Sequence, residues 1–337
     1  MADNSKQGFL NTLFQWTVKN TAAEAAISTA AAATTTTSDV QPMTEEKKIW
    51  LHNALDNMTV NPVERLKLCI SKIKDSQVAD DQKKEFLDEL CHWSEELDLA
   101  KDFFTVGGLD ILTQLLDHSN DEIRTQTCSL LATLVQNNDH CQRIIVQSGL
   151  QQKLLKIVDE SNNADLKTKA VTAISALIRG YTLGQLQLQK FQGAKVLIKA
   201  LSSPIPRLQN KLCFLINTIC SSSAQMKKIF FENGGLEELI RLFNNEACPD
   251  QQHVLETILT LSSAKPNALS ALAERDSTLA EQFQQKLDER RQVIQSSEEY
   301  EEEYNLINQI RTLLTSSTTE NVAPSTTHVD QQLVPIS

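Results

Sequence analysis

The chain has 337 residues, only 5% of them aromatic, and a formal net charge of −11. A surface that follows nucleic-acid phosphates needs a basic face, and an anionic membrane repels an acidic protein. We therefore expect neither a nucleic acid nor a membrane as partner. The length is enough to bury a large core in one elongated domain or in two compact ones.

The first predicted element is an apolar segment within residues 1–20, in the stretch "GFLNTLFQWTVKN". It lacks the basic start and the long apolar core of a secretory signal, so we expect a cytoplasmic protein. Residues 21–44 are rich in Ala and Thr and are predicted to be a disordered linker. The apolar side chains of the segment are Phe9, Leu10, Leu13, Phe14 and Trp16.

Residues 45–98 are predicted to form an N-terminal helical cap. One helix should begin with Asn61 as its N-cap and Pro62 in its first turn, and Glu64 should complete a capping box. The stretch "DDQKKEFLDELCHWSEELDLA", residues 80–100, is predicted to continue as helix. Its apolar side consists of Phe86, Leu87, Leu90 and Cys91.

Residues 99–275 contain a repeat that is marked by glycine. Six of the nine glycines stand at related places, namely Gly107, Gly108, Gly149, Gly193, Gly234 and Gly235. With the second glycine of each pair as reference, the steps are 41 (149−108), 44 (193−149) and 42 (235−193) residues. Self-similarity at such a period is typical of helical solenoids.

The surroundings of each glycine repeat as well. In the second unit a short apolar helix "CQRIIVQSG" precedes the glycine, "GLQQKLLKIV" follows it, and the longer "DLKTKAVTAISALIR" comes next. Three helices in a unit of about 42 residues are the armadillo arrangement, in which each unit must stack on its neighbours. The predicted fold is therefore all-α, a right-handed armadillo-repeat solenoid of about four repeats with helical caps and disordered termini.

Residues 276–315 are predicted to be a C-terminal helical cap, with a charged terminal helix or helix pair over 278–314. The run "EEYEEEY" at 298–304 is interpreted as a solvated helix face, with an acidic contact strip as the alternative. Residues 316–337 are predicted to be disordered.

The sequence shows no constellation that would carry out a reaction. Phosphate loops, nucleotide fingerprints and nucleophile elbows are absent. The seven cysteines are scattered without metal-ligand spacing and are interpreted as buried, reduced thiols. The "DHC" run at 139–141 combines an acid, a base and a thiol, but side chains that are neighbours in sequence at a helix end do not converge on one catalytic site. We expect no enzyme, no cofactor and no metal.

The concave face of such a solenoid is lined by the long third helices. In armadillo proteins that bind nuclear-localisation peptides this helix resembles "EAAWALSNIA". Its Trp position is occupied here by Ser129, Thr172, Phe214 and Glu256, and its Asn position by Thr133, Ala176, Thr218 and Thr260. The missing Trp and Asn side chains argue against an import adaptor.

The same helix alignment predicts which side chains face inward. Lys169, Arg179 and Lys211 would suit a partner that presents carboxylates, although each could be merely solvated. Phe214 is either an exposed anchor or part of the core. The predicted face consists of Gln126, Ser129, Lys169, Thr172, Arg179, Lys211, Phe214 and Thr218.

Several stretches together resemble one family. They are "EEKKIWLHNAL", "LDELCHWSEELDLAKDFFTVGGLDIL", "VTAISALIRG" and "SEEYEEEYNLINQIRTLL". The resemblance is to the armadillo-type nucleotide exchange factors of DnaK-type heat-shock chaperones, the heat-shock-protein-binding protein family and its fungal relatives. It runs from about residue 45 to 315 and extends to the N-terminus, where the family's "LLxWS…N" is matched by Leu13, Phe14, Trp16, Thr17 and Asn20.

The resemblance implies a cochaperone whose concave face binds the ATPase domain of a cytosolic DnaK-type chaperone and promotes ADP release. It also implies that the N-terminal segment mimics a client at the chaperone's peptide-binding domain. The alternative for that segment is an amphipathic helix docked on the protein's own cap. The alternative for the whole chain is a general armadillo scaffold that binds an extended peptide. We expect a monomer.

Overall fold

The computed structural model describes residues 61–248 and 250–315, which form helices without a β-strand. The predicted apolar segment, the linker, the start of the N-terminal cap and the C-terminal tail lie outside these residues. The first two helices are α3 (Pro62–Lys74) and α4 (Asp80–Trp93). Within the described ranges no helix is long and apolar enough to cross a membrane.

Four groups of three helices follow. Their bounds are α5 (Leu97–Thr105), α6 (Gly108–Leu115) and α7 (Asp121–Val135), then α8 (Asp139–Ser148), α9 (Leu150–Glu160) and α10 (Ala164–Ile178). The next are α11 (Thr182–Lys190), α12 (Gly193–Leu201) and α13 (Pro206–Ser222), then α14 (Ala224–Glu232), α15 (Gly235–Asn244) and α16 (Gln251–Ser262). The last helices are α17 (Ser270–Arg275), α18 (Ser277–Ile294) and α19 (Glu301–Thr315), with a 3₁₀ turn, η1 (Glu298–Tyr300).

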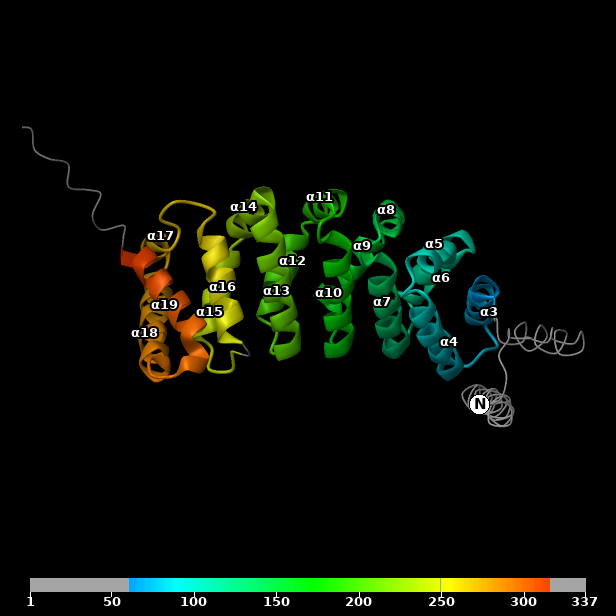
Figure 1. The fold of residues 1–337 in the computed structure, drawn as a ribbon, viewed down its shortest axis with the longest axis horizontal. Helices are drawn as coiled ribbons and strands as arrows, with labels where there is room; N and C mark the ends of the chain where they lie inside the picture. The colour runs from blue at the N-terminus through cyan, green and yellow to red at the C-terminus, as the bar shows by residue number, and fades with distance from the viewer. Residues whose placement is uncertain (1–60, 249, 316–337) are drawn as a thin grey trace, which may run out of the picture. The chain divides into compact units, whose positions relative to one another are not determined.

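The third helices of successive groups pack against each other. In Figure 1, α4, α7, α10, α13, α16 and α19 follow one another in chain order, and each contacts the next. A middle helix such as α10 is covered on several sides, so residues of most of its faces are buried, including Leu166, Val171, Ile174 and Leu177. Each buried aliphatic side chain contributes about 1.5–3 kcal/mol relative to exposure. The predicted all-α repeat is confirmed for the described residues, while the exact division into caps and repeats stays a prediction.

The glycine register differs from the one predicted. The left-handed residue that joins first and second helices is Gly107 (φ 91°), Gly149 (φ 77°), Gln192 (φ 52°) or Gly234 (φ 83°). The steps between these residues are 42 (149−107), 43 (192−149) and 42 (234−192), which is more regular than the predicted spacing. The first glycine of each pair, rather than the second, is therefore the equivalent of Gly149.

The second glycine of each pair has another role, which is close approach. A Cβ on Gly108 would lie 2.2 Å from the ring of Phe103, and a Cβ on Gly193 would lie 2.3 Å from Leu188. In the units that carry Gly108, Gly193 and Gly235, the first helix therefore packs directly over the first residue of the second helix. Two separate demands, one on φ and one on space, explain why glycines come in pairs.

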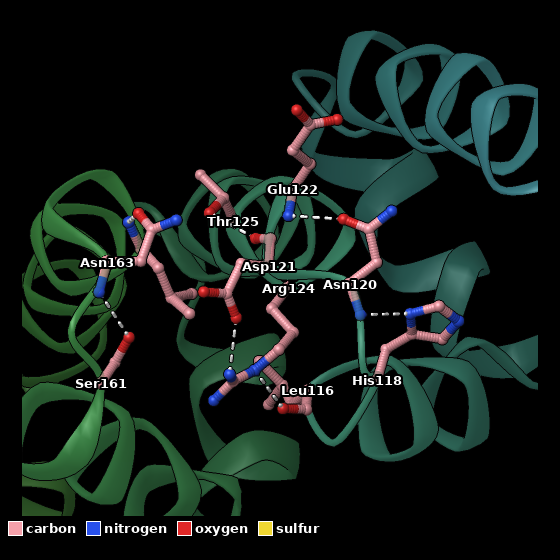
Figure 2. A network of polar contacts seen from close by, with 10 residues as sticks. Leu116, His118, Asn120, Asp121, Glu122, Arg124, Thr125, Ser161 and Asn163 are labelled. Atoms are coloured by element: carbon pink, nitrogen blue, oxygen red, sulfur yellow. Dashed lines mark hydrogen bonds and ion pairs between the residues drawn. The ribbon is translucent and has the colours of Figure 1, made fainter.

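Three of the four third helices, α7, α10 and α16, begin with a side-chain cap, and Figure 2 shows the residues at the start of α7 and α10. The N–H of Glu122 donates to Oδ1 of Asn120 at 2.9 Å, and Asn120 itself donates its N–H to Nδ1 of His118 at 3.1 Å. In the next unit Asn163 caps α10 and its N–H donates to Oγ of Ser161 at 3.1 Å. These caps satisfy N–H groups that a helix start leaves without partners.

The N-terminal helices are partly as predicted. Asn61 caps α3 with Pro62 in the first turn, whereas the Glu64 carboxylate pairs with Lys67 at 2.8 Å instead of closing a capping box. The predicted continuous helix over 80–100 is wrong, because it is interrupted between Trp93 and Leu97. The break lets α5 turn away and pack against α3 and α7.

The interpretation of residues 298–304 as a solvated face is wrong at Glu303. This side chain is 3% exposed and accepts two hydrogen bonds from Arg290, at 2.7 and 2.8 Å. The hydrogen bonds with Glu303 raise the pKa of Arg290 above its usual value. Glu298, Glu299, Glu301 and Glu302 are exposed, so one carboxylate of the run joins α18 to α19 and these others face solvent.

Candidate functional site: the face of the third helices

The eight predicted face residues lie on or at the end of α7, α10 and α13, three helices that pack consecutively. We call this surface the ladder face. Its members are Gln126, Ser129, Lys169, Thr172, Arg179, Lys211, Phe214 and Thr218. The structure divides them into two groups by how their polar atoms are used.

Four members are engaged within the protein. The amide of Gln126 donates from Nε2 to Oδ1 of Asp88 on α4 at 3.0 Å. The hydroxyls of Ser129, Thr172 and Thr218 each donate to the carbonyl four residues earlier, at 3.2, 2.9 and 2.8 Å. These three hydroxyls therefore offer a partner acceptor oxygens rather than hydrogen-bond donors.

The other four members project into solvent. Lys169, Arg179 and Lys211 are exposed, and Phe214 is 44% exposed, which excludes the alternative of a core phenylalanine. Within residues 61–248 and 250–315, Lys169 and Lys211 have no carboxylate close enough for an ion pair. An exposed ring beside unpaired cations is a surface that burial against an acidic partner would stabilise.

Arg179 and Phe214 form one unit across two helices. The guanidinium lies over the Phe214 ring, 5.6 Å from its centroid, and such a stack contributes about 0.5–1 kcal/mol at an exposed site. Arg179 follows the last residue of α10, and its N–H donates to the carbonyl of Ser175 at 3.1 Å. The guanidinium also reaches Oγ of Ser175 at 3.5 Å, so it is held beside the ring.

Sequence reasoning missed a cation one helical turn from Lys211 and a hydrogen bond between two repeats. Arg207 lies 3.8 Å from Asp165, one helical turn before Lys211. Thr260 on α16 donates to Oδ1 of Asn217 at 2.6 Å, across 43 residues (260−217), which is one repeat. The repeat distance itself is the signal that could have found such pairs.

A charge pattern was also missed. Residues 166–231 contain ten Lys or Arg residues and no Asp or Glu, within a chain of net charge −11. The stretch spans most of α10 to α14, so it includes the exposed cations of the ladder face. The acidic composition of the whole chain therefore conceals a strongly basic middle.

Among the described residues, the cysteines and the "DHC" run do not form a catalytic or metal-binding cluster. Cys141 of the "DHC" run is buried while His140 is exposed, and burial raises the pKa of the Cys141 thiol to about 11. Burial likewise raises the pKa of Cys128 to about 12. In the described part of the chain, no three His, Cys, Asp or Glu side chains gather to hold a metal ion.

Two family models match the chain. The nucleotide exchange factor Fes1 model matches residues 10–103, and the SIL1/FES1/HPBP1 C-terminal domain model matches residues 99–204. Together the two models match residues 10–204 of the chain. The second match includes five ladder-face residues and ends before Lys211, Phe214 and Thr218. These two matches confirm the resemblance found in the sequence.

Relatives within the family agree over much of the chain. Hsp70-binding protein 1 of Rattus norvegicus is 27% identical over 298 residues, 83% of this chain and 82% of the relative. The human protein of that name is 27% identical over 277 residues, 78% of this chain and 76% of its own length. The Hsp70 nucleotide exchange factor FES1 of Mycosarcoma maydis is 28% identical over 125 residues, 37% of this chain and 32% of the relative.

Solved structures confirm the armadillo fold. A designed armadillo repeat protein, YIII(Dq)4CqI, matches with a TM-score of 0.58 and 17% identity over 74% of this chain and 99% of its own. A second design, YIII(Dq.V1)4CPAF in complex with peptide (KR)4, matches with a TM-score of 0.59 and 18% identity over the same shares.

Proposed function

We propose that this protein is a cochaperone that binds the ATPase domain of an Hsp70 chaperone and promotes ADP release. Its relatives are named as Hsp70-binding proteins and nucleotide exchange factors. The observation that carries the proposal is the ladder face, where Lys169, Arg179 and Lys211 are exposed beside Phe214. Such a surface binds a protein lobe and performs no bond chemistry.

The mechanism is a shift of populations. A protein that binds the open, ADP-losing state of the ATPase domain better than the closed state moves the equilibrium toward the open state. A change from 1:99 to 99:1 requires about 5.5 kcal/mol of differential affinity. Stacked helices that are fixed by packing can discriminate in this way, because a surface that adapts to both states binds both alike. Once ADP has left, ATP enters and the chaperone releases its client.

The ladder face supplies this affinity in three ways. The cations meet carboxylates of the ATPase domain, and the Phe214 ring becomes buried as an anchor. Arg179 is held against that ring before binding, so little side-chain freedom is lost in the complex. Gln126, Ser129, Thr172 and Thr218 contribute surface and acceptor oxygens.

The general-scaffold alternative has less support. The designed protein noted above carries a basic (KR)4 peptide, and the ladder face of this chain is itself basic, so it would repel such a ligand. An unbiased pull-down separates the two functions. Recovery of proteins that share an extended peptide motif, without an Hsp70 chaperone, would favour the scaffold.

The decisive experiment measures release of labelled ADP from an Hsp70 chaperone, with and without the full chain. We expect the release rate to rise with the concentration of the chain. An unchanged rate would contradict the proposal. The ATPase domain alone should respond as the whole chaperone does, because the ladder face binds that domain.

The second part of the proposal concerns the N-terminal segment, which lies outside the described residues. We propose that Phe9, Leu10, Leu13, Phe14 and Trp16 occupy the chaperone's peptide-binding domain as a client mimic. The Fes1 family match begins at residue 10 and so includes most of this segment. A flexible linker of the length of residues 21–44 typically spans about 25–30 Å, which separates the two contacts.

Deletion of residues 1–20 tests this part. We expect ADP release to persist while release of a bound client slows. A free peptide of residues 8–20 should compete with client for the isolated peptide-binding domain. A lower melting temperature of the shortened chain, together with no competition by the peptide, would instead indicate a helix docked on the protein's own cap. The cytoplasmic location and the monomeric state stay predictions.

A further inference from the structure

A pocket of about 690 Å³ lies where the C-terminal ends of α13, α16 and α19 meet the loop that precedes α17. It is separate from the ladder-face cations. Its lining residues include Ser221 from α13, Thr260 from α16 and Leu313 from α19. Nothing in the proposed exchange function uses this pocket.

The polar part of the pocket is suited to an anion. Lys227 and Lys265 line it, and its lining contains no Asp or Glu. The Lys227 ammonium donates to Oγ of Ser263 at 2.9 Å, and the Lys265 ammonium lies 5.2 Å from the centroid of the Phe231 ring. Both cations are therefore held by neutral groups, and neither is neutralised by a carboxylate of the lining.

The remaining wall is aliphatic. Leu259 is half-buried and Leu269 is 2% exposed, whereas Leu313 is 42% exposed at the mouth. A pocket with two cations, several hydroxyls and an aliphatic wall fits a peptide that combines one carboxylate with aliphatic side chains. That combination defines the class of ligand.

The chain carries such a peptide just beyond the described residues. We propose that the pocket binds the chain's own segment "HVDQQLVPI", residues 328–336. Asp330 would supply the carboxylate for the two lysines, and Leu333, Val334 and Ile336 the aliphatic contacts. The whole stretch 316–337 has no Lys or Arg that the pocket would repel.

The length of chain favours this occupant over a separate peptide. The described residues end at Thr315, only two positions after Leu313 in the pocket wall. Asp330 lies fifteen positions after Thr315 (330−315). A flexible chain of that length has a typical end-to-end distance of about 20 Å. Such a tether gives an effective concentration of roughly millimolar, so even a weak contact is populated.

Zero-length carbodiimide cross-linking of the full chain tests the contact, because it joins a carboxylate to an amine only when the two are in contact. We expect an amide between Asp330 and Lys227 or Lys265 at least tenfold more often than between Asp330 and Lys228. Lys228 is the matched control, since it is exposed on the same helix and does not line the pocket. Equal yields at all three lysines would overturn the proposal.

Mixing chains of natural and ¹⁵N composition shows whether the link forms within one molecule. Links only between molecules would overturn the assignment to the chain's own tail.

Hydrogen exchange provides a readout that needs no cross-link. The amides of Leu333, Val334 and Ile336 should exchange at least tenfold faster in a Lys227→Ala, Lys265→Ala variant than in the native chain. Unchanged exchange there, with native melting behaviour, would also overturn the proposal.

Discussion

The two ends of the described chain and its middle use charged side chains differently. At the N-terminal end, Arg65 on α3 donates from Nε and Nη2 to the two oxygens of the Glu89 carboxylate on α4, the Nη2 contact being 2.8 Å. At the C-terminal end, Arg290 binds the buried Glu303 in the same bidentate way. In the middle, residues 166–231 contain ten cations and no acid. Only Lys199, Arg207 and Lys228 of these ten lie near a carboxylate among the described residues.

The difference shows where charge serves folding and where it serves binding. A terminal repeat has one neighbour, so its helices need specific polar contacts to close the end of the core. A middle repeat is packed from both sides and does not need its surface charges for stability. Its cations repel one another slightly, and an acidic partner relieves that repulsion.

The largest expected effect comes from removing a paired charge at an end. Glu303→Ala should lower the free energy of unfolding by about 3–5 kcal/mol, because Arg290 keeps its charge and loses its partner in a partly buried site. Urea unfolding measures the change. Glu299→Ala, in the same acidic run but exposed, should change the unfolding free energy by less than about 0.5 kcal/mol. Equal effects of the two variants would show that the end is not held by this pair.

Charge reversal in the middle should act on binding instead. Arg179→Glu with Lys211→Glu should weaken binding to an Hsp70 ATPase domain by roughly 100-fold or more, since reversed charges repel the carboxylates they met. The melting temperature should hardly change. Lys195→Glu with Lys228→Glu, on α12 and α14, is the control of equal charge and should bind nearly normally. An early thermal transition of the first variant would mean that its residues are structural.

Two phenylalanines sharpen the comparison within the middle. Phe214→Ala should weaken ATPase-domain binding by about 2 kcal/mol, the scale of an interface anchor, with little loss of stability. Phe230→Ala, at a ring with 0% exposure, should cost about 3–5 kcal/mol of folding stability. Binding titrations beside urea unfolding separate the two effects. A folding defect at Phe214 that matches the one at Phe230 would remove the distinction between anchor and core.

The smallest effect is a pH dependence at the N-terminal end. The hydrogen bond from Arg65 lowers the pKa of Glu89 below its usual value. The stabilisation is therefore present above the unfolded pKa of about 4.3 and is lost as the pH falls through the lower folded pKa. Because Arg65 is 35% exposed, we expect only about 1 kcal/mol. Unfolding free energies of native chain and Glu89→Gln should differ above pH about 4.5 and converge in acid. Glu85→Gln, exposed on the same helix, should show no such convergence.

The repeat could be predicted from sequence because its signals are local. A left-handed junction requires glycine or a tolerant residue, and an apolar face repeats every three to four positions, whatever the rest of the chain does. These signals were enough for helices, their order and the armadillo arrangement. The end of α4 had no local signal in the sequence. It depends on tertiary packing, because α5 turns away to pack against α3 and α7. The glycine register needed the backbone angles, because glycine serves both φ and space.

The candidate site divides in the same way. Spacing along each helix predicted that Lys169, Arg179 and Lys211 share one face, and all three side chains are exposed. Whether Phe214 is core or surface depended on how α13 packs between α10 and α16. Its sequence neighbours on both sides are buried, so the apolar periodicity of α13 did not decide between the two. Gln126 is held by Asp88, which lies 38 residues away (126−88) on another helix. Tertiary packing decided that the Gln126 amide is engaged, because a hydrogen bond between helices joins residues that the sequence keeps far apart, whereas Ser129, Thr172 and Thr218 bond locally within their own helices.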